Sequence, residues 1–397
     1  MKRGDGAGYA TLSVMRILLF VLLVVVTASP ASAQPANEES AALIAQITRA
    51  KSGAIVDIPA GRYDLRDLKI RRDLTLRGDP SGDVEFYSSR STAKGILNPL
   101  PGVSLTVENI AFRGAVSPDL NGAGIRHDGR DLTVRNCRFI DNENGILSTG
   151  DERGVVTITT SAFIDNGHGD GYSHGIYMVR GARLAIADSR FVGTRIGHHV
   201  KSLARETTIT GSTLDDAEGG SSYAVDASRG GAVAISGNTI IQSASSENAA
   251  IFNYDLTRGG KAVSLSITDN RIINRRRRGV FLRNATSLSP QAANNTVINE
   301  NGGTLDMGDA EAPGGDDPAA AVRKAFAGRI GDAPATAPHP VRLETLAPAR
   351  PPKRALLTAP TIEKTSDALF SFKLENNANE DAPADYLTFA HPLPRGA

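Results

Sequence analysis

The chain alternates apolar and polar residues over short segments that recur along much of its length. LTVRNCRF, VTITTSAF, LAIADSRF and TTITGSTL are four of these segments, and each has apolar residues at alternating positions. Alternation with a period of two predicts β-strands that bury one face, whereas a helix would space its apolar residues by three and four. The pattern therefore predicts an all-β body made of many short strands.

The segments align as an internal repeat. One column of the alignment is small and polar in most repeats and recurs every 23 to 32 residues, at Ile110, Cys137, Ser161, Ser189, Ser212, Asn238, Asn270 and Asn295. Units this short cannot bury an apolar face alone, so we expect them to stack as a solenoid. The polar column is expected to form a ladder inside a turn, where side chains bond from repeat to repeat and satisfy buried backbone groups.

With this repeat, the sequence over residues 55–299 resembles the right-handed parallel β-helix, or pectate-lyase-like, superfamily. The segment that leads into the repeat is also similar to that superfamily: residues 40–50 form an amphipathic helical pattern, and AIVDIPAGRYDL and LTLRG follow. The resemblance implies a right-handed parallel β-helix solenoid whose open end is capped by an N-terminal helix. It matches no specific enzyme family. Glycan-active members are common in the superfamily, but a fold alone does not define a reaction.

Four parts are expected along the chain. Residues 1–33 have a basic start, the apolar run 17–26 and a small-residue cleavage site, which is typical of a signal peptide; an uncleaved anchor is the alternative. Residues 34–54 form the cap, residues 55–302 the β-helix, and residues 303–397 a Pro/Ala-rich linker and a mostly disordered tail with one strand-like run, LFSFKL. We therefore expect a periplasmic or secreted protein without a membrane span after signal cleavage.

The charge balance argues against nucleic acid as a partner, and the cysteine content excludes an intrachain disulfide. The 44 basic and 43 acidic residues nearly cancel, so no overall field directs the protein to nucleic acid. Cys137 is the only cysteine, so no intrachain disulfide forms and stability must come from the core.

The repeat register predicts a row of outward side chains. Ile125, Ile146, Ile176, Val200 and Val225 are expected to stack inward, which turns their neighbours Arg126, Leu147, Tyr177, Lys201 and Asp226 outward. Adjacent turns are about 4.8 Å apart, so Tyr177, Lys201 and Asp226 should lie side by side. His199 is expected one outward position before Lys201. Arg205 follows Lys201 by four residues, and Asn253 continues the row.

These residue types fit elimination or epimerisation at a uronic acid. Arg205 or Lys201 would neutralise the substrate carboxylate, and His199, Lys201 or Tyr177 would take the C5 proton. Tyr177 would protonate the leaving oxygen, and Asp226 completes the predicted site. Together with the glycan-active members of the superfamily that the sequence resembles, these residues favour a lyase or epimerase acting on an acidic polysaccharide. A solvated row, with Lys201 and Asp226 as a weak exposed pair, is the alternative; the protein would then be a non-catalytic glycan-binding or surface-structural protein.

Other chemical motifs are less specific. His174 and His198 alternate with the outward row, so they are expected to point inward, each with a backbone partner rather than a metal. Gly167-His168-Gly169 resembles one motif of polygalacturonase-like hydrolases, but the paired aspartates and Arg-x-Lys of those enzymes are missing, which favours a glycine turn.

Two charged segments leave further alternatives open. The loop with Asp215, Asp216 and Glu218 could supply a hydrolase carboxylate or oxygen ligands for Ca²⁺, or be a solvated turn. No other cofactor is indicated. The run of arginines at 275–278 could hold an anionic glycan or be a charged exposed turn.

Overall fold

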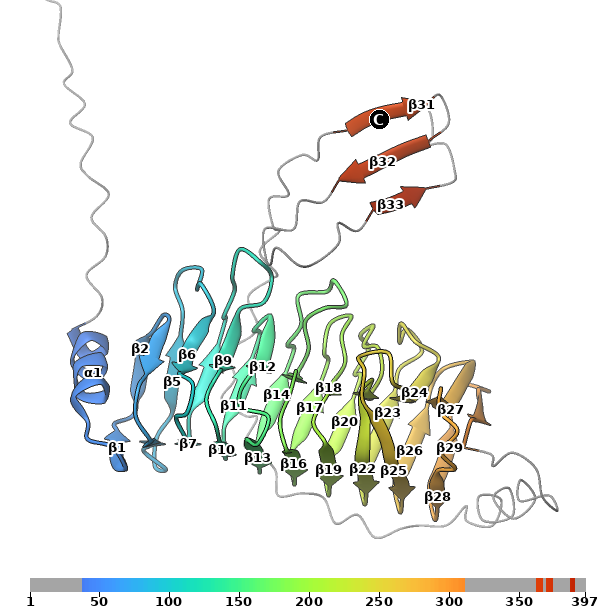
Figure 1. Cartoon of the computed structure of the whole chain (residues 1–397), viewed down its shortest axis with the longest axis horizontal. Coiled ribbons are helices and arrows are strands. Elements are labelled where there is room, and N and C mark those ends of the chain that lie inside the picture. The colour runs from blue at the N-terminus through green and yellow to red at the C-terminus, as the bar shows by residue number, and fades with distance from the viewer. Residues whose placement is uncertain (1–37, 311–361, 367–368, 374–385, 390–397) are drawn as a thin grey trace, which may run out of the picture. The chain divides into compact units, whose positions relative to one another are not determined.

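The computed structural model describes residues 38–310 and three short strands at 362–366, 369–373 and 386–389. The predicted signal peptide and most of the predicted linker and tail lie outside the described residues. Residues 54–308 form a solenoid of stacked turns (Figure 1).

Each turn contributes one strand to each of three ten-stranded parallel sheets. Sheet A comprises β1 (Ala54–Ile58), β4 (Leu74–Gly78), β7 (Leu105–Glu108), β10 (Leu132–Arg135), β13 (Val155–Thr159), β16 (Arg183–Ala187), β19 (Glu206–Thr210), β22 (Gly230–Ser236), β25 (Lys261–Thr268) and β28 (Gln291–Ala293). Sheet B comprises β2 (Gly61–Asp64), β5 (Val84–Tyr87), β8 (Ala111–Arg113), β11 (Arg138–Ile140), β14 (Ala162–Ile164), β17 (Arg190–Val192), β20 (Thr213–Asp215), β23 (Thr239–Gln242), β26 (Arg271–Asn274) and β29 (Thr296–Asn299). Sheet C comprises β3 (Leu68–Ile70), β6 (Gly95–Pro99), β9 (Ala123–His127), β12 (Asn144–Ser148), β15 (Ile176–Met178), β18 (Val200–Ser202), β21 (Val225–Ala227), β24 (Ala250–Tyr254), β27 (Arg278–Asn284) and β30 (Thr304–Gly308).

The core is a set of inward columns that run along the solenoid. On sheet B the rings of Phe112, Phe139, Phe163 and Phe191 stack face to face, with neighbouring centroids 4.6 to 5.0 Å apart. On sheet C the predicted inward column is fully buried, from Ile125 to Val225. Parallel strands joined by right-handed crossovers build such a coil. The predicted right-handed parallel β-helix is therefore confirmed.

The N-terminal end of the solenoid is covered by α1 (Glu38–Arg49), as the sequence predicted. Leu43 and Ile47 on its inner face are buried in the core. Ser40 Oγ accepts a hydrogen bond from the N–H of Asp64, 3.0 Å away, which ties the helix to the first turn. At the other end, β30 extends the solenoid to Gly308, past the predicted boundary at 302.

The corner between sheets A and B, here called the A–B corner, carries the predicted polar ladder. From Ser161 to Asn295, each ladder side chain accepts the backbone N–H of the preceding turn: the N–H of Ser161 donates to Ser189 at 3.1 Å, that of Ser212 to Asn238 at 2.9 Å, and that of Asn238 to Asn270 at 3.0 Å. The residue before the ladder position has a positive φ, which is why Gly211 and Gly237 occupy it in two turns. The ladder therefore satisfies backbone groups that the tight bend buries.

The corner between sheets B and C, here called the B–C corner, varies in length. Its longer connections span residues 114–122, 165–175, 193–199, 216–224 and 243–249, whereas β11 and β12 are joined by residues 141–143 alone. Figure 1 shows loops that rise above the strand layer along this part of the solenoid. The solenoid therefore offers one regular corner and one corner whose loops differ from turn to turn.

The described tail strands form a small antiparallel sheet of β31 (Ile362–Ser366), β32 (Leu369–Lys373) and β33 (Tyr386–Phe389). The strand-like run LFSFKL is therefore confirmed as a strand over Leu369–Lys373. Among the described residues, no helix has the length and apolar character needed to cross a membrane.

Candidate functional site on sheet C

The predicted outward row is present on sheet C. Tyr177 on β15 pairs in register with Lys201 on β18, and Lys201 pairs with Asp226 on β21. The row continues through Asn253 on β24 to Arg283 on β27. Three of the five predicted site residues are thus direct neighbours, in the order that the repeat predicted.

Lys201 lies between its two neighbours in the row. Its Nζ is 3.2 Å from Asp226 Oδ2 and 5.4 Å from the centroid of the Tyr177 ring. The Lys201 side chain is 12 % exposed, so the ammonium is held in a partly dry site by a carboxylate and an aromatic face. This burial argues against the alternative of a weak exposed pair.

Asp226 is the most connected carboxylate of the row. It is buried, and it accepts hydrogen bonds from Asn253 Nδ2 at 2.7 Å and from Ser228 Oγ at 3.1 Å. The same Asn253 amide also donates to Asp255, 3.1 Å away, so the next turn holds a second buried carboxylate that the sequence analysis did not identify.

His198 also contacts Asp226, with 3.4 Å between Nε2 and Oδ2. Its Nδ1 accepts the N–H of Tyr223 at 3.2 Å, and this bond assigns the remaining ring proton to Nε2. Burial lowers the pKa of His198 to about 4, so the ring is neutral at pH 7, with its Nε2 beside Asp226. His198 is buried, as expected, and the contact with Asp226 also places it beside the row.

His198 belongs to a mixed ladder at the B–C corner. The N–H of His198 donates to His174 Nδ1 at 3.1 Å, and the N–H of His174 donates to Asn144 Oδ1 at 2.9 Å. The two imidazoles stack, with centroids 4.8 Å apart. The predicted backbone partners of both histidines are therefore confirmed: imidazole nitrogens here do what asparagine oxygens do in the A–B ladder.

The structure corrects the predicted orientation of His199. The residue was expected to point outward, but its ring is completely buried, and it bonds Asp216 through Nε2 at 2.9 Å and Thr194 through Nδ1 at 2.8 Å. The backbone bends over residues 193–199, so strand alternation holds only from Val200 onward. His199 therefore links loops and does not face the row.

Arg205, the fifth predicted site residue, does not contact the row either. It is exposed in the turn between β18 and β19, and within residues 38–310 its guanidinium forms no hydrogen bond or ion pair. Two other arginines are closer to the row. Arg283 is one of them and donates to Tyr223 Oη at 3.2 Å. Arg258 is the other: burial raises the pKa of the Tyr177 phenol, and the positive charge of Arg258 offsets this rise in part.

The acidic loop after β20 has one carboxylate that is buried and one that is exposed. Asp216 is buried and accepts hydrogen bonds from the Ser243 N–H and the Ser246 hydroxyl in addition to His199. The Glu218 side chain is 98 % exposed. Within the described part of the chain, no group of three or more His, Cys, Asp and Glu side chains is placed to hold a metal ion. The carboxylates of this loop therefore do not converge on a Ca²⁺ site in this structure.

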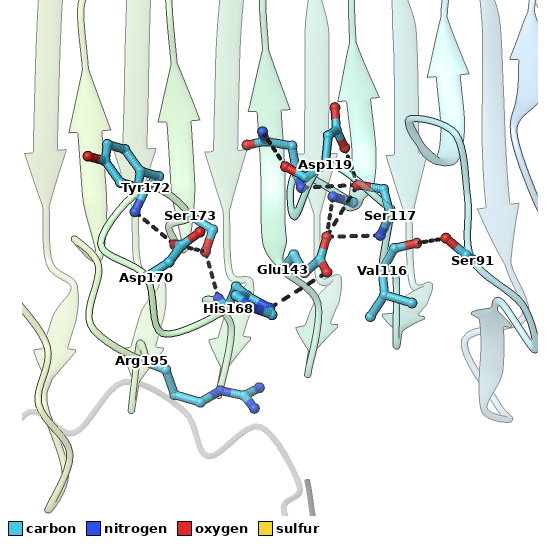
Figure 2. A network of polar contacts seen from close by, with 12 residues as sticks. Ser91, Val116, Ser117, Asp119, Glu143, His168, Asp170, Tyr172, Ser173 and Arg195 are labelled. Carbon is cyan, nitrogen blue, oxygen red and sulfur yellow. Dashed lines mark hydrogen bonds and ion pairs between the residues drawn. The ribbon is translucent and has the colours of Figure 1, made fainter. Parts of the chain in front are cut away.

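A second polar network joins three turns at the B–C corner (Figure 2). Glu143 Oε2 accepts the N–H groups of Ser117 at 2.9 Å and Gly122 at 2.7 Å, which fixes the loop after β8. Its Oε1 is 3.7 Å from Nδ1 of His168, on the loop after β14. Burial raises the pKa of Glu143, and these hydrogen bonds offset the rise in part.

The geometry around His168 also explains the Gly-His-Gly triplet. Gly167 and Gly169 both have positive φ, 106° and 99°, so the glycines are required by the turn, as one interpretation of the sequence held. Figure 2 shows Asp170 and Ser173 between His168 and Tyr172. The network therefore stabilises long loops beside sheet C and exposes Tyr172 at their edge.

Comparisons with known proteins give distant similarities only. No protein-family model and no curated protein matches the sequence. A solved structure of ORF18 from Geobacillus virus E2 is 15 % identical, has a TM-score of 0.48, and covers 68 % of this chain and 56 % of its own. The PL6 family alginate lyase AlyGC is 17 % identical, has a TM-score of 0.37, and covers 67 % of this chain and 37 % of its own. This chain thus spans little more than half of the first structure and about a third of the second.

Proposed function

We propose that the protein is exported and acts on an acidic polysaccharide that binds across the outer face of sheet C, as a uronate lyase or epimerase. The observation that supports this proposal is the position of Lys201, held between the Tyr177 ring and the Asp226 carboxylate on three adjacent turns. A row of residues that follows the solenoid axis suits an extended chain. An ammonium within it suits a sugar unit that carries a carboxylate.

Lys201 is the residue best placed to exchange the C5 proton. As an ammonium it cannot accept a proton, but Asp226 Oδ2 is 3.2 Å away and can take one from it. A substrate carboxylate brought next to Asp226 repels the negative charge of that side chain and so favours its accepting a proton. Proton transfer from Lys201 to Asp226 then leaves a neutral amine, and this amine removes the C5 proton.

Tyr177 is the proton donor in this scheme. Burial raises its pKa, so the phenol keeps its proton at neutral pH. In a lyase the phenol gives that proton to the glycosidic oxygen as the bond to C4 breaks, and a double bond forms between C4 and C5. In an epimerase no bond to C4 breaks, and a proton returns to the opposite face of C5.

A non-catalytic glycan-binding protein is the second candidate, and one observation favours it. His198 uses Nδ1 to accept the Tyr223 N–H and directs Nε2 to Asp226, so its ring has no free lone pair for a base. Asp226 is likewise surrounded by donors. Without the proton transfer from Lys201 to Asp226, the row would bind an anionic sugar and leave it unchanged.

Absorbance of unsaturated products tests the proposal. The protein without residues 1–33 is incubated with sodium alginate and sodium polygalacturonate, and uronate epimerisation is followed in parallel by ¹H NMR. Lys201→Ala should lower the rate by about 10²-fold or more. Lys69→Ala removes the same charge from the outer face of β3 and should leave the rate unchanged. Binding without turnover on either polymer would reject the enzyme and leave the binding protein.

A further inference from the structure

A basic hollow lies at the B–C corner, away from the row. It is an open hollow of about 470 Å³, lined by Ala244 from the loop after β23, by Arg276 and Arg277 from the turn between β26 and β27, and by Arg278 at the start of β27. A volume of this size is within the range of small-ligand sites. The hollow involves none of the residues placed in the proton-transfer scheme.

The positive charge of the hollow is not balanced locally. The preceding residue, Arg275, pairs with Glu300 at 2.9 Å and lies 3.9 Å from Glu218. Arg276 donates to the Ser246 carbonyl instead. Arg277 and Arg278 are exposed, and neither has a carboxylate within 4.0 Å among residues 38–310. Three guanidinium groups on consecutive residues repel one another, and a bound anion would relieve that repulsion.

Strand β27 links the hollow to the row. Arg278 begins the strand at the corner, and Arg283 on the same strand pairs in register with Asn253, next to Asp226. Five residues of strand separate the two arginines by about 16 Å. A polymer that crosses sheet C obliquely from Lys201 can therefore reach Arg283 first and the hollow afterwards.

We propose that the hollow formed by Arg276, Arg277 and Arg278 is a second anion-binding subsite that holds a carboxylate or sulfate group of the same acidic polysaccharide, several sugar units from Lys201. The identity of the ligand rests on the proposed function. Guanidinium groups suit this task, because their planar N–H donors bind carboxylate and sulfate in pairs and stay charged at every physiological pH.

Binding measured apart from turnover tests the subsite. Titration calorimetry compares the protein with the double variant Arg277→Gln/Arg278→Gln, using polygalacturonate and trigalacturonate as probes. The control is Arg190→Gln/Arg271→Gln, which removes two exposed arginines from sheet B. The hollow variant should raise the Kd for the polymer about tenfold, consistent with the loss of charged hydrogen bonds. It should change the Kd for the trimer less than twofold, and the control should change neither. Thermal unfolding checks that both variants remain folded.

Each other outcome has one meaning. Equal polymer affinities for the hollow variant and the control overturn the subsite, even if the protein proves to be a lyase. A loss of polymer affinity in a protein without turnover sustains the subsite and rejects the enzyme. Affinity for single-stranded DNA of equal charge that matches the polymer affinity overturns the assignment to a polysaccharide, because the hollow would then be a general polyanion surface.

Discussion

The two polar ladders of the solenoid solve the same problem with different residues. At the A–B corner, serine and asparagine repeat in register and the bend has two residues in most turns, such as Asn136 and Cys137. At the B–C corner, Asn144, His174 and His198 accept the next backbone N–H, while the loops around them change length from turn to turn. The regular corner fixes the register of the sheets. The irregular corner adds titratable groups and places them beside the candidate site.

The difference shows where acid acts on this fold. The A–B ladder from Ser161 to Asn295 contains no group that titrates between pH 4 and 7. Sheet C and its corner contain His127, His174 and His198, all buried. Burial lowers the pKa of His127 and His198 to about 4, and it also lowers the pKa of His174.

The largest expected effect is therefore loss of stability in acid. An unfolded histidine titrates near pH 6.5, so between pH 6.5 and 4 the unfolded chain binds more protons than the native one. Stability falls as the pH falls through this window, by roughly 3 kcal/mol for His127 and a similar amount for His198. Urea unfolding at pH 7 and pH 4.5 measures the loss. A free energy of unfolding that is flat over this range would show that these rings are not buried as neutral groups.

Removal of His199 should have the next largest effect. His199→Ala leaves the buried Asp216 carboxylate without the imidazole, which costs about 4 kcal/mol of folding free energy. Urea unfolding measures this cost, and Glu218→Ala on the same loop is the control with an exposed side chain. A fully stable His199→Ala protein with an impaired rate would instead restore the original prediction that His199 is catalytic.

The A–B ladder gives a comparable but smaller loss. Asn238→Ala removes the acceptor of the Ser212 N–H, which is left buried and unpaired, and also removes a donor to the Ile209 carbonyl. We expect a loss of about 3 kcal/mol in urea unfolding. Asn238→Ser should recover much of it, because serine fills this position in neighbouring turns. No recovery by serine would contradict the interchangeability of ladder residues.

The smallest effect is expected for His198→Asn. Asparagine can accept the Tyr223 N–H as Asn144 accepts that of His174, so stability at pH 7 should change by less than about 1 kcal/mol. The acid sensitivity between pH 6.5 and 4 should shrink at the same time, since one titrating ring is lost. An unchanged pH dependence of unfolding would show that His198 does not contribute to the acid loss.

The sequence predicted the features that repeat. The ladder positions, the inward column from Ile125 to Val225 and the row of Tyr177, Lys201 and Asp226 all follow from a period of two and a fixed register. These features could be predicted because every turn repeats the same pattern, so a wrong alignment of one turn is revealed by the turns next to it.

The misplaced residues lie where the repeat is interrupted. His199 departs from its expected outward orientation because the bend over residues 193–199 ends the alternation just before Val200. The ladder of His174 and His198, in contrast, had a signal in the sequence. Each histidine lies two residues before an inward residue, Ile176 or Val200, so the two occupy the same position in successive turns. The contact of Glu143 with His168 had no such signal, since loop conformation alone creates it.

Cys137 occupies the ladder position of its turn, and this has a consequence for how the protein meets reactive reagents. Its thiol is 1 % exposed and burial raises its pKa to about 12, so the native protein offers no thiolate to an alkylating or oxidising agent. An unfolded cysteine reacts readily near pH 8.5. The rate at which the single thiol is modified therefore reports how often the solenoid opens at its fourth turn. A molecule that stays closed cannot be crosslinked to another through this residue.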